Sequence, residues 1–359
     1  MNALSAGELK ARITRRFLAK GVAIAALSGI AYGLYSAFVT RAMGRGVWAD
    51  WYSGKAALTP FVVMVVLGVL GSGINDLASA VWAVGIAGIK GKLGDFARCV
   101  RTKPGHAIMV CAAVGGPIAS AAYIVALQMA GSIVAPIAAL CPAIGAIISR
   151  FLFRQALNGR MLLGIGLCLS TTVVIGWSSL TGAAGENAVL GCAIALIAAL
   201  GWAIEGAVAG FSTSVVEYEI GITIRQATSG LLNLLVVFPL MCLLAGNLAL
   251  APRLAFAALS SGPAMLVFAV SGFFALFAFS LWYKGNSMCG TALGMAANGA
   301  YAFWVPFFCW LVLGVGFGEP GWVLTPVMWV AAVVMVLGIL LIAVNPLDYL
   351  RRPRPDKAA

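Results

Sequence analysis

Two carboxylates lie deep inside apolar stretches of this chain, and aromatic residues accompany one of them. Asp76 and Glu205 are the only acidic residues well inside such stretches. A carboxylate at bilayer depth costs about 2.5–3.5 kcal/mol, so it usually faces a cavity or a partner. Trp202 precedes Glu205 by three residues, which puts both on one helix face. A carboxylate beside aromatic rings suits a compact organic cation, because each desolvated ring face adds about 0.5–2 kcal/mol of attraction.

The same three-residue spacing recurs elsewhere in the chain, at Tyr32 and Tyr35 and again along Asn298, Tyr301 and Trp304. We therefore predict a cation site built from residues of three distant segments: Tyr32, Tyr35, Trp202, Glu205, Asn298, Tyr301 and Trp304. Asp76 and Glu205 are the candidates for coupling a proton, although the Gly/Ser/Asn-rich surroundings of Asp76 also fit a helix kink. The alternative for the rings is ordinary packing or an interface belt, and for the carboxyls a simple helix-to-helix contact.

The composition excludes a soluble protein. Of 359 residues, 62% are hydrophobic and 9% are charged, where a soluble chain has roughly 25% charged residues. Mean hydropathy is +1.02. The eight cysteines are scattered without a CxxC pair, and there is a single histidine, His106. We therefore predict neither a disulfide framework, a metal site nor a cofactor, and we expect no nucleic-acid partner despite the net charge of +12.

The apolar stretches predict an all-α integral membrane protein with about ten transmembrane helices. Each stretch is near the ~20 residues that a bilayer needs. The predicted spans are Phe17–Thr40, Ala56–Ile89, His106–Met129, Ser132–Phe153, Met161–Leu180, Ala188–Phe211, Ile222–Leu244, Pro263–Tyr283, Thr291–Leu313 and Trp322–Val344.

The first and sixth predicted spans carry the same stripe of small residues, 170 positions apart. A four-residue step keeps each stripe on one helix face, where small side chains let helix backbones approach closely. The stripes are Gly21, Ala25, Gly29, Gly33 and Ala37, and Gly191, Ala195, Ala199, Ala203 and Ala207. They predict two five-helix repeats, 17–180 and 188–345, between an N-terminal segment 1–16 and a tail 346–359.

The basic residues orient this stack. With the N-terminus inside, the inner segments hold 19 of the 23 Lys and Arg residues, as the positive-inside rule requires. Both termini of this multi-pass protein are then predicted to be cytoplasmic, and localisation is to the cell membrane. Five spans per half make the second repeat inverted relative to the first. Arg225 opens the seventh span and is interpreted as an interface or ion-pair residue, with Glu217 or Glu219 as the candidate partner, and not as a ligand.

Ten spans in two inverted halves resemble the drug/metabolite transporter superfamily (EamA-like). The run Tyr123–Gly176 is similar to that family's third to fifth spans, including Pro142. Where the superfamily often has Gly-Glu, this chain has Arg154-Gln155, so no role of that glutamate carries over.

More narrowly, the chain resembles the LicB-type choline permeases of that superfamily. Four pieces carry this resemblance: LSGIAYGL (27–34), GWAIEGAVAGF (201–211), IRQATSGL (224–231) and the N-x-x-Y-x-x-W beginning at Asn298. The resemblance implies a cage of Tyr32, Trp202, Glu205 and Tyr301 around a quaternary ammonium. Tyr32 stands where members of that family usually carry Trp, which keeps an aromatic face.

The resulting expectation is a secondary transporter, not an enzyme, that takes up choline or a similar cation by alternating access, with protons as the candidate coupling ion. The first alternative is an exporter of amino acids or other small metabolites. The second is a membrane-embedded enzyme, against which stand the lone His106, the unclustered cysteines and the lack of a soluble catalytic domain.

Overall fold

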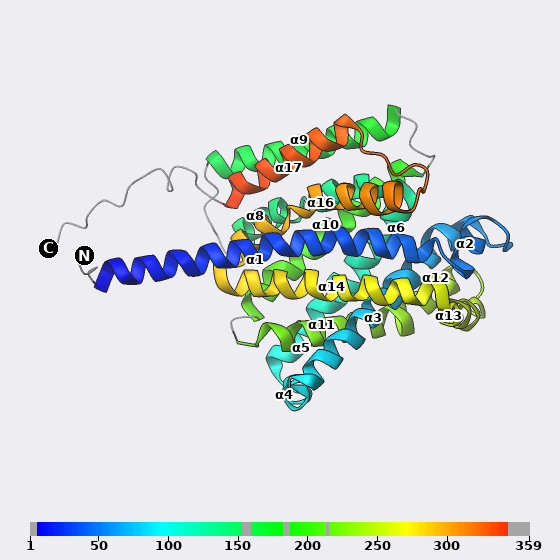
Figure 1. The fold of residues 1–359 in the computed structure, drawn as a ribbon, viewed down its shortest axis with the longest axis horizontal. Helices are drawn as coiled ribbons and strands as arrows, with labels where there is room; N and C mark the ends of the chain where they lie inside the picture. Colours follow the sequence, from blue (N-terminus) through cyan, green and yellow to red (C-terminus); the bar gives the residue numbers. More distant parts are fainter. Residues whose placement is uncertain (1–5, 153–158, 182–186, 213–214, 344–359) are drawn as a thin grey trace.

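The structure is a computed structural model that describes residues 6–152, 159–181, 187–212 and 215–343. The tail 346–359, the first five residues and the Arg154-Gln155 pair lie outside these ranges. Throughout the described ranges the regular structure is helical, with no strand. The prediction of an all-α membrane protein is confirmed at this level. The helices run mostly lengthwise and are stacked into one bundle (Figure 1).

The helices of the first half have the following bounds: α1 (Ala6–Met43), α2 (Val47–Tyr52), η1 (Val62–Val66), α3 (Leu67–Ile89), α4 (Leu93–Cys99), α5 (Lys103–Ala113), η2 (Val114–Ser120), α6 (Ala121–Ala130), η3 (Gly131–Ile133), α7 (Val134–Ala138), α8 (Cys141–Leu152) and α9 (Gly159–Thr181). Those of the second half are α10 (Ala188–Ser212), α11 (Tyr218–Leu232), η4 (Asn233–Val237), α12 (Phe238–Leu244), α13 (Leu250–Ser260), α14 (Gly262–Cys289), α15 (Thr291–Asn298), α16 (Tyr301–Phe308), η5 (Cys309–Gly316) and α17 (Pro326–Ala343).

Within the described ranges, seven helical stretches are long and apolar enough to cross a membrane: Arg16–Met43, Val62–Ile89, Lys103–Ala138, Ala188–Ala207, Tyr218–Leu244, Gly262–Cys289 and Gly294–Gly316. Three shorter apolar helices cover Leu162–Thr171, Leu250–Ser260 and Pro326–Leu341. The helix Leu250–Ser260 was not predicted as a span. The stretch Lys103–Ala138 contains the predicted third span and the beginning of the predicted fourth. A full set of ten spans stays a prediction.

The small-residue stripes allow close helix contacts, as predicted. A side-chain carbon added to Gly33 would lie 2.7 Å from the carbonyl oxygen of Trp304, and one on Gly191 would lie 2.8 Å from the Cβ of Ala130. Larger side chains at these positions would therefore push the helices apart. The first stripe seats α1 against α14, α15 and α16, while the second helps seat α10 against α6.

Several helix pairs far apart in the sequence lie side by side. α1 packs along α14, α3 along α11, and α9 along α17 (Figure 1). α10 packs against α6 and α7, and α16 packs against α1 and α7. Side chains of α1, α10, α14 and α16 converge inside the bundle, where the candidate site lies.

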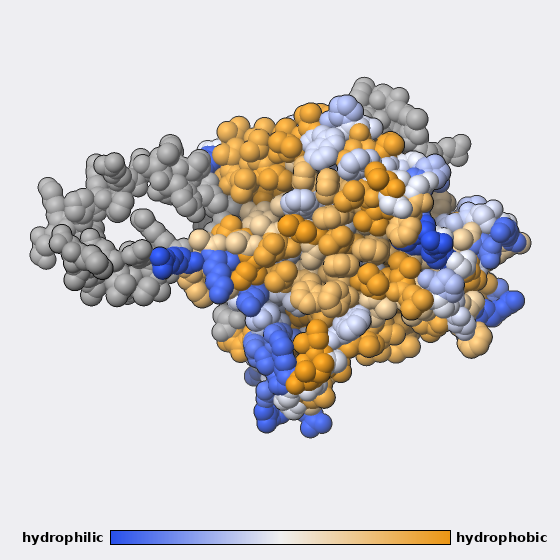
Figure 2. All heavy atoms as spheres, viewed as in Figure 1, coloured by the Kyte–Doolittle hydropathy of each residue, from blue (hydrophilic) through white to orange (hydrophobic). Residues whose placement is uncertain are grey.

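The outside of the bundle suits a bilayer. Large apolar side chains on many helices are exposed, and Figure 2 shows apolar residues over most of the visible face, with hydrophilic groups gathered toward its ends. At one end, Lys90 Nζ lies 2.6 Å from Glu219 Oε1, and Lys92 binds both Glu217 and Glu219. Hydrogen bonds to these two carboxylates raise the pKa of Lys92. At the other end, Arg41 pairs with Glu319.

Candidate functional site

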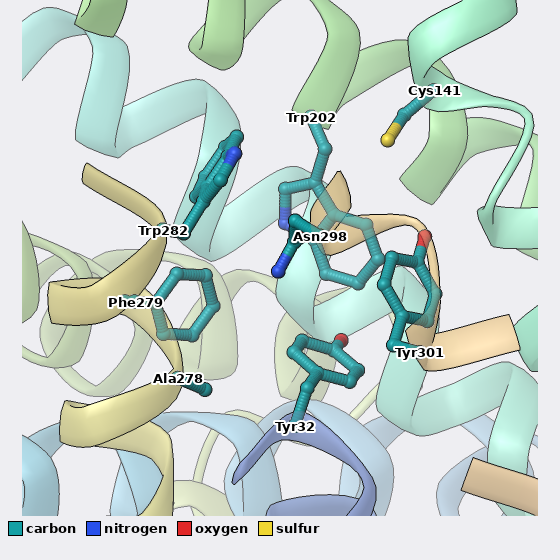
Figure 3. Close-up of a pocket in the computed structure, with 8 residues that line it drawn as sticks. All are labelled: Tyr32, Cys141, Trp202, Ala278, Phe279, Trp282, Asn298 and Tyr301. Carbon is teal, nitrogen blue, oxygen red and sulfur yellow. The ribbon is translucent and has the colours of Figure 1, made fainter. Parts of the chain in front are cut away.

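A small cavity lies where side chains of α1, α8, α10, α14, α15 and α16 converge (Figure 3). Its volume is about 20 Å³, which is room for about one water molecule. Most of its lining is aromatic: Tyr32 of α1, Trp202 of α10, Phe279 and Trp282 of α14, and Tyr301 of α16, together with Cys141, Ala278 and Asn298. Residues more than 260 positions apart in the sequence thus share one chamber.

The rings of this chamber are arranged around Tyr32. Its ring centroid lies 4.7 Å from that of Tyr301, 5.7 Å from that of Trp202 and 6.2 Å from that of Phe279. The planes of Tyr32 and Trp202 are nearly perpendicular, at 85°. Edge-to-face contacts of this kind are favourable in themselves, so the rings support one another when the chamber is empty.

Among the described residues, three polar atoms of the chamber lack a hydrogen bond, whereas the side-chain nitrogens of Trp202 and Asn298 each donate one. The hydroxyls of Tyr32 and Tyr301 and the indole nitrogen of Trp282 are buried and form no hydrogen bond with the described residues. In Figure 3 the Tyr32 hydroxyl points into the ring cluster, toward Trp202 and Asn298. Buried polar groups are nearly always paired, so a group of unpaired ones calls for an explanation such as a water or a ligand.

Glu205 lies outside the chamber lining, in a neighbouring cluster of charged groups. Arg225 Nε donates to Glu205 Oε1 at 2.9 Å, and Arg225 Nη2 lies 3.3 Å from Oε2. The Tyr283 hydroxyl donates to the same Oε1 at 3.0 Å. Both side chains of the ion pair are fully buried. Arg225 is an ion-pair residue, as predicted, but Glu217 and Glu219 were the wrong partners because they bind Lys90 and Lys92 instead.

An irregular helical turn lets these groups come together. The π-helical segment η2 contains Pro117, which donates no backbone hydrogen bond. The carbonyl of Gly115 accepts from Trp202 Nε1 at 3.1 Å and from Arg225 Nη2 at 3.2 Å. A side-chain carbon at Gly115 would lie 1.8 Å from Glu205 Oε2. Only glycine therefore fits beside the carboxylate, and its carbonyl ties the chamber wall to the ion pair.

Asp76 belongs to an extension of this charged cluster. It is buried on α3 and accepts a hydrogen bond from the Ser229 hydroxyl on α11. On the same pair of helices, Arg225 Nη1 donates to the Gln226 side chain, whose amide nitrogen donates to Ser79. Polar contacts therefore run from Glu205 along α11 to α3. Asp76 does not line the aromatic chamber.

Phe279 separates the two regions. Its ring lines the chamber, and the guanidinium carbon of Arg225 lies 3.9 Å from the ring centroid. Neither Phe279 nor Trp282 was predicted as a site residue. The signal was present, because these two residues are three apart on one helix, the same spacing that singled out Trp202 and Glu205.

Other predicted site residues lie at different places around the chamber. Asn298 lines it, and its side-chain nitrogen donates to Ser28. Tyr35 lies behind Tyr32, with a ring separation of 5.1 Å, and does not line the cavity. Trp304 is half-buried and stacks on Phe308 with centroids 5.9 Å apart. The structure thus brings Tyr32, Trp202, Asn298 and Tyr301 together, and leaves Tyr35, Trp304, Glu205 and Asp76 outside the lining.

Fold and site together define a helical membrane protein with a buried aromatic chamber. No family model matches the chain, and no curated protein matches it either. One solved structure, described only as the crystal structure of a protein, aligns with 88% of this chain and 94% of its own, at 20% identity and a TM-score of 0.46. At this TM-score and identity, the alignment supports no conclusion about the fold or the function of this chain.

Proposed function

We propose that this chain is a secondary transporter that moves a small quaternary ammonium compound, choline first among them, across the cell membrane by alternating access. The observation that carries the proposal is the aromatic chamber, in which rings from α1, α10, α14 and α16 meet in the middle of the bundle. A quaternary ammonium has no N–H to donate, so ring faces must replace its hydration.

The eight residues that line the chamber include no charged one, so a cation would be held there by ring faces and not by a carboxylate. Glu205 is already neutralised by Arg225 at 2.9 Å in this conformation. The guanidinium also occupies one side of Phe279. An entering cation would therefore be held by Tyr32, Trp202 and Tyr301, while Glu205 acts as a counter-charge only if its pairing with Arg225 loosens. Substrate binding and rearrangement of the ion pair are linked in this proposal.

The size of the chamber fits a transporter in a closed state. At about 20 Å³ the cavity has room for one water and not for choline. Loading requires α14 and α16 to move away from α1 and α10. An inside-negative potential would drive uptake of a single positive charge by about 2.3 kcal/mol per 100 mV, even without a coupled ion. Asp76 remains our candidate for a coupled proton.

Helix packing supports the proposed ten-span inverted repeat. When the halves 17–180 and 188–345 are matched in chain order, α1 corresponds to α10, and the stretch from α5 to α6 corresponds to α14. α1 packs along α14 and α10 packs along α6, while α3 with α11, and α9 with α17, pair across the halves. A two-fold relation between the halves requires these reciprocal contacts.

The proposed orientation puts both termini in the cytoplasm. The segment from Lys90 to Lys103 contains five basic residues and would face inward. A cysteine introduced at Gly94, which is exposed on α4, should be labelled by a membrane-impermeant thiol reagent only after cells are opened. Labelling in intact cells would overturn this orientation.

The substrate class is tested by thermal stabilisation of the purified protein. A ligand that binds the folded state at 100 times its Kd stabilises it by about 2.7 kcal/mol. We expect choline to stabilise, and its neutral isostere, with carbon in place of nitrogen, to do so much less. Equal stabilisation by both compounds would remove the cation site. Stabilisation by neutral amino acids alone would favour the metabolite exporter instead.

A further inference from the structure

A second cavity opens between α3, α11 and α14, at the end of the bundle that carries the Lys90 and Lys92 ion pairs. Its volume is about 260 Å³, and it shares no lining residue with the aromatic chamber. The walls are mostly apolar and come from α3 and α14: Ala83, Ile86, Ala87, Leu276, Phe277 and Leu281. Its polar groups lie on one side, at the helix ends.

Two lysines mark the polar side of this cavity, and they differ in their partners. Lys90 Nζ lies 2.6 Å from Glu219 Oε1 and is therefore neutralised. Lys284 Nζ lies 5.0 Å from the ring centroid of Tyr218, and no carboxylate of the described residues comes within ion-pair distance of it. Lys284 is half-buried. The cavity therefore offers one ammonium group that lacks a counter-charge.

The other charges around the cavity cancel, so Lys284 sets its net charge. Glu219 also lines the cavity, but its carboxylate binds Lys90 and Lys92. Glu217 binds Lys92, so two carboxylates face two ammonium groups before Lys284 is counted. Hydrophilic residues gather over the region of α4 and α5 beside a broad apolar surface (Figure 2). The charge at this end of the cavity is complementary to an anion.

The apolar side of the cavity continues to the outside of the bundle. Phe277 lines the cavity and is 39% exposed, on the part of α14 that would face acyl chains. A soluble anion would gain nothing from this wall. A phospholipid would place its phosphate at Lys284 and lay one acyl chain along the wall of α3 and α14, as basic pockets between membrane helices do.

We propose that this cavity binds an anionic glycerophospholipid, with Lys284 holding the phosphate group and the face between α3 and α14 holding an acyl chain. Tyr218, Ser280 and Thr223 also line the polar side. A zwitterionic lipid carries its own cation next to the phosphate and gains less from Lys284. The site is distinct from the proposed transport function and does not depend on it.

The test uses the full chain in nanodiscs that contain phosphatidylglycerol or phosphatidylcholine, followed by native mass spectrometry after release into detergent. We expect the parent protein to retain phosphatidylglycerol. Loss of one lysine near a phosphate is worth about 1 kcal/mol, so Lys284→Gln should weaken retention about fivefold. Lys284→Arg should restore it, because the positive charge remains.

Two controls separate this site from general attraction to basic surfaces. Lys55→Gln removes an exposed lysine that pairs with Asp50 at a distant end of the bundle, and it should leave lipid retention unchanged. Glycerol 3-phosphate, which has the charge without the chains, should fail to displace the lipid. The proposal is wrong if Lys284→Gln and Lys55→Gln retain phosphatidylglycerol equally, or if the soluble phosphate competes as well as the lipid does.

Discussion

The aromatic chamber and the charged cluster beside it share one wall, yet they differ in how many of their polar groups are hydrogen-bonded. In the chamber, Tyr32, Tyr301 and Trp282 each bury a polar atom without a partner. In the cluster, the Glu205 carboxylate receives donors from Arg225 and Tyr283. Phe279 lies between them, facing the cavity and the Arg225 guanidinium.

This difference suits the proposed roles of the two regions, with ligand binding in the chamber and helix-to-helix contact in the cluster. A buried ion pair with all its hydrogen bonds satisfied is tightly constrained, and breaking it leaves an uncompensated charge. Hydroxyl groups without a hydrogen-bond partner in a ring-lined cavity are not held in this way, so a ligand could enter without breaking a hydrogen bond. The proposed function puts substrate binding in the chamber, whereas the cluster holds α10 and α11 against η2 through the contacts of Arg225 with Glu205 and Gly115.

The largest effect should follow from breaking the cluster. Glu205→Gln keeps the shape and removes the charge that neutralises Arg225, so we expect it to lower the stability of the protein by about 3–5 kcal/mol. The measurement is the thermal unfolding midpoint of the purified protein in detergent. A destabilised variant can bind choline weakly for that reason alone. Choline binding to Glu205→Gln therefore does not by itself test whether Glu205 is a counter-charge for the substrate.

A double variant provides the matched control. Glu205→Gln combined with Arg225→Gln removes both members of the ion pair. It should recover part of the stability that the single variant loses, because neither member is left buried without the other. If the single variant is as stable as the parent, Glu205 and Arg225 do not depend on each other, and the comparison between chamber and cluster fails.

Half of the chamber lining was predicted from the sequence, whereas the pairing within the charged cluster was not. Tyr32, Trp202, Asn298 and Tyr301 were predicted because a three-residue spacing repeats on separate segments, which two inverted halves would bring together. The pairing of Glu205 with Arg225 was not predicted because Arg225 lies on a different helix, in the middle of α11, and two carboxylates nearer in the sequence, Glu217 and Glu219, were the expected partners.

The contacts made by an irregular backbone segment could not be predicted from the sequence either. The Gly115-Gly116-Pro117 run predicts an interruption, and η2 is found there. Nothing in its spacing indicates that the freed carbonyl of Gly115 accepts from both Trp202 and Arg225. Those contacts depend on the three-dimensional crossing of η2, α10 and α11. The same holds for Phe279, whose role follows from what lies on each side of its ring.

The Asp76→Asn variant tests whether the polar contacts between α11 and α3 take part in proton coupling and not in choline binding. Asp76→Asn removes a titratable group that accepts from Ser229, while leaving the chamber lining intact. We expect accumulation of choline against its gradient to be lost in proteoliposomes and exchange to persist. Undiminished proton-driven accumulation would take Asp76 out of the mechanism. Loss of choline binding would place it in the site instead.

Trp202→Ala tests the chamber directly. Removing this ring opens one wall of the cage, so the affinity for choline should fall at least tenfold, equivalent to about 1.4 kcal/mol. Trp202→Phe keeps an aromatic face and should cost less. The Trp202 indole also donates to Gly115 at 3.1 Å, so both variants lose that bond. Equal losses in the two variants would therefore assign the effect to the hydrogen bond and not to the cage.

The smallest effect is expected for the hydroxyl of Tyr32, and it sharpens the comparison because Tyr283 offers a matched control. Both tyrosines are buried, but the Tyr283 hydroxyl donates to Glu205 at 3.0 Å whereas the Tyr32 hydroxyl has no partner. Hydrogen bonds to charged groups contribute about 1.5–3 kcal/mol. Tyr283→Phe should therefore destabilise the protein by about that amount in a thermal unfolding assay.

Tyr32→Phe removes a hydroxyl that contributes no hydrogen bond and keeps the ring that faces the cavity. We expect its stability to equal or slightly exceed that of the parent, because an unsatisfied buried group costs about 1–3 kcal/mol and is deleted along with the hydroxyl. The affinity for choline should change by less than about threefold, since ring faces and not hydroxyl groups hold a quaternary ammonium. If Tyr32→Phe destabilises the protein as much as Tyr283→Phe does, the hydroxyl groups of the chamber are hydrogen-bonded as those of the cluster are. The proposed difference between the two regions would then be wrong.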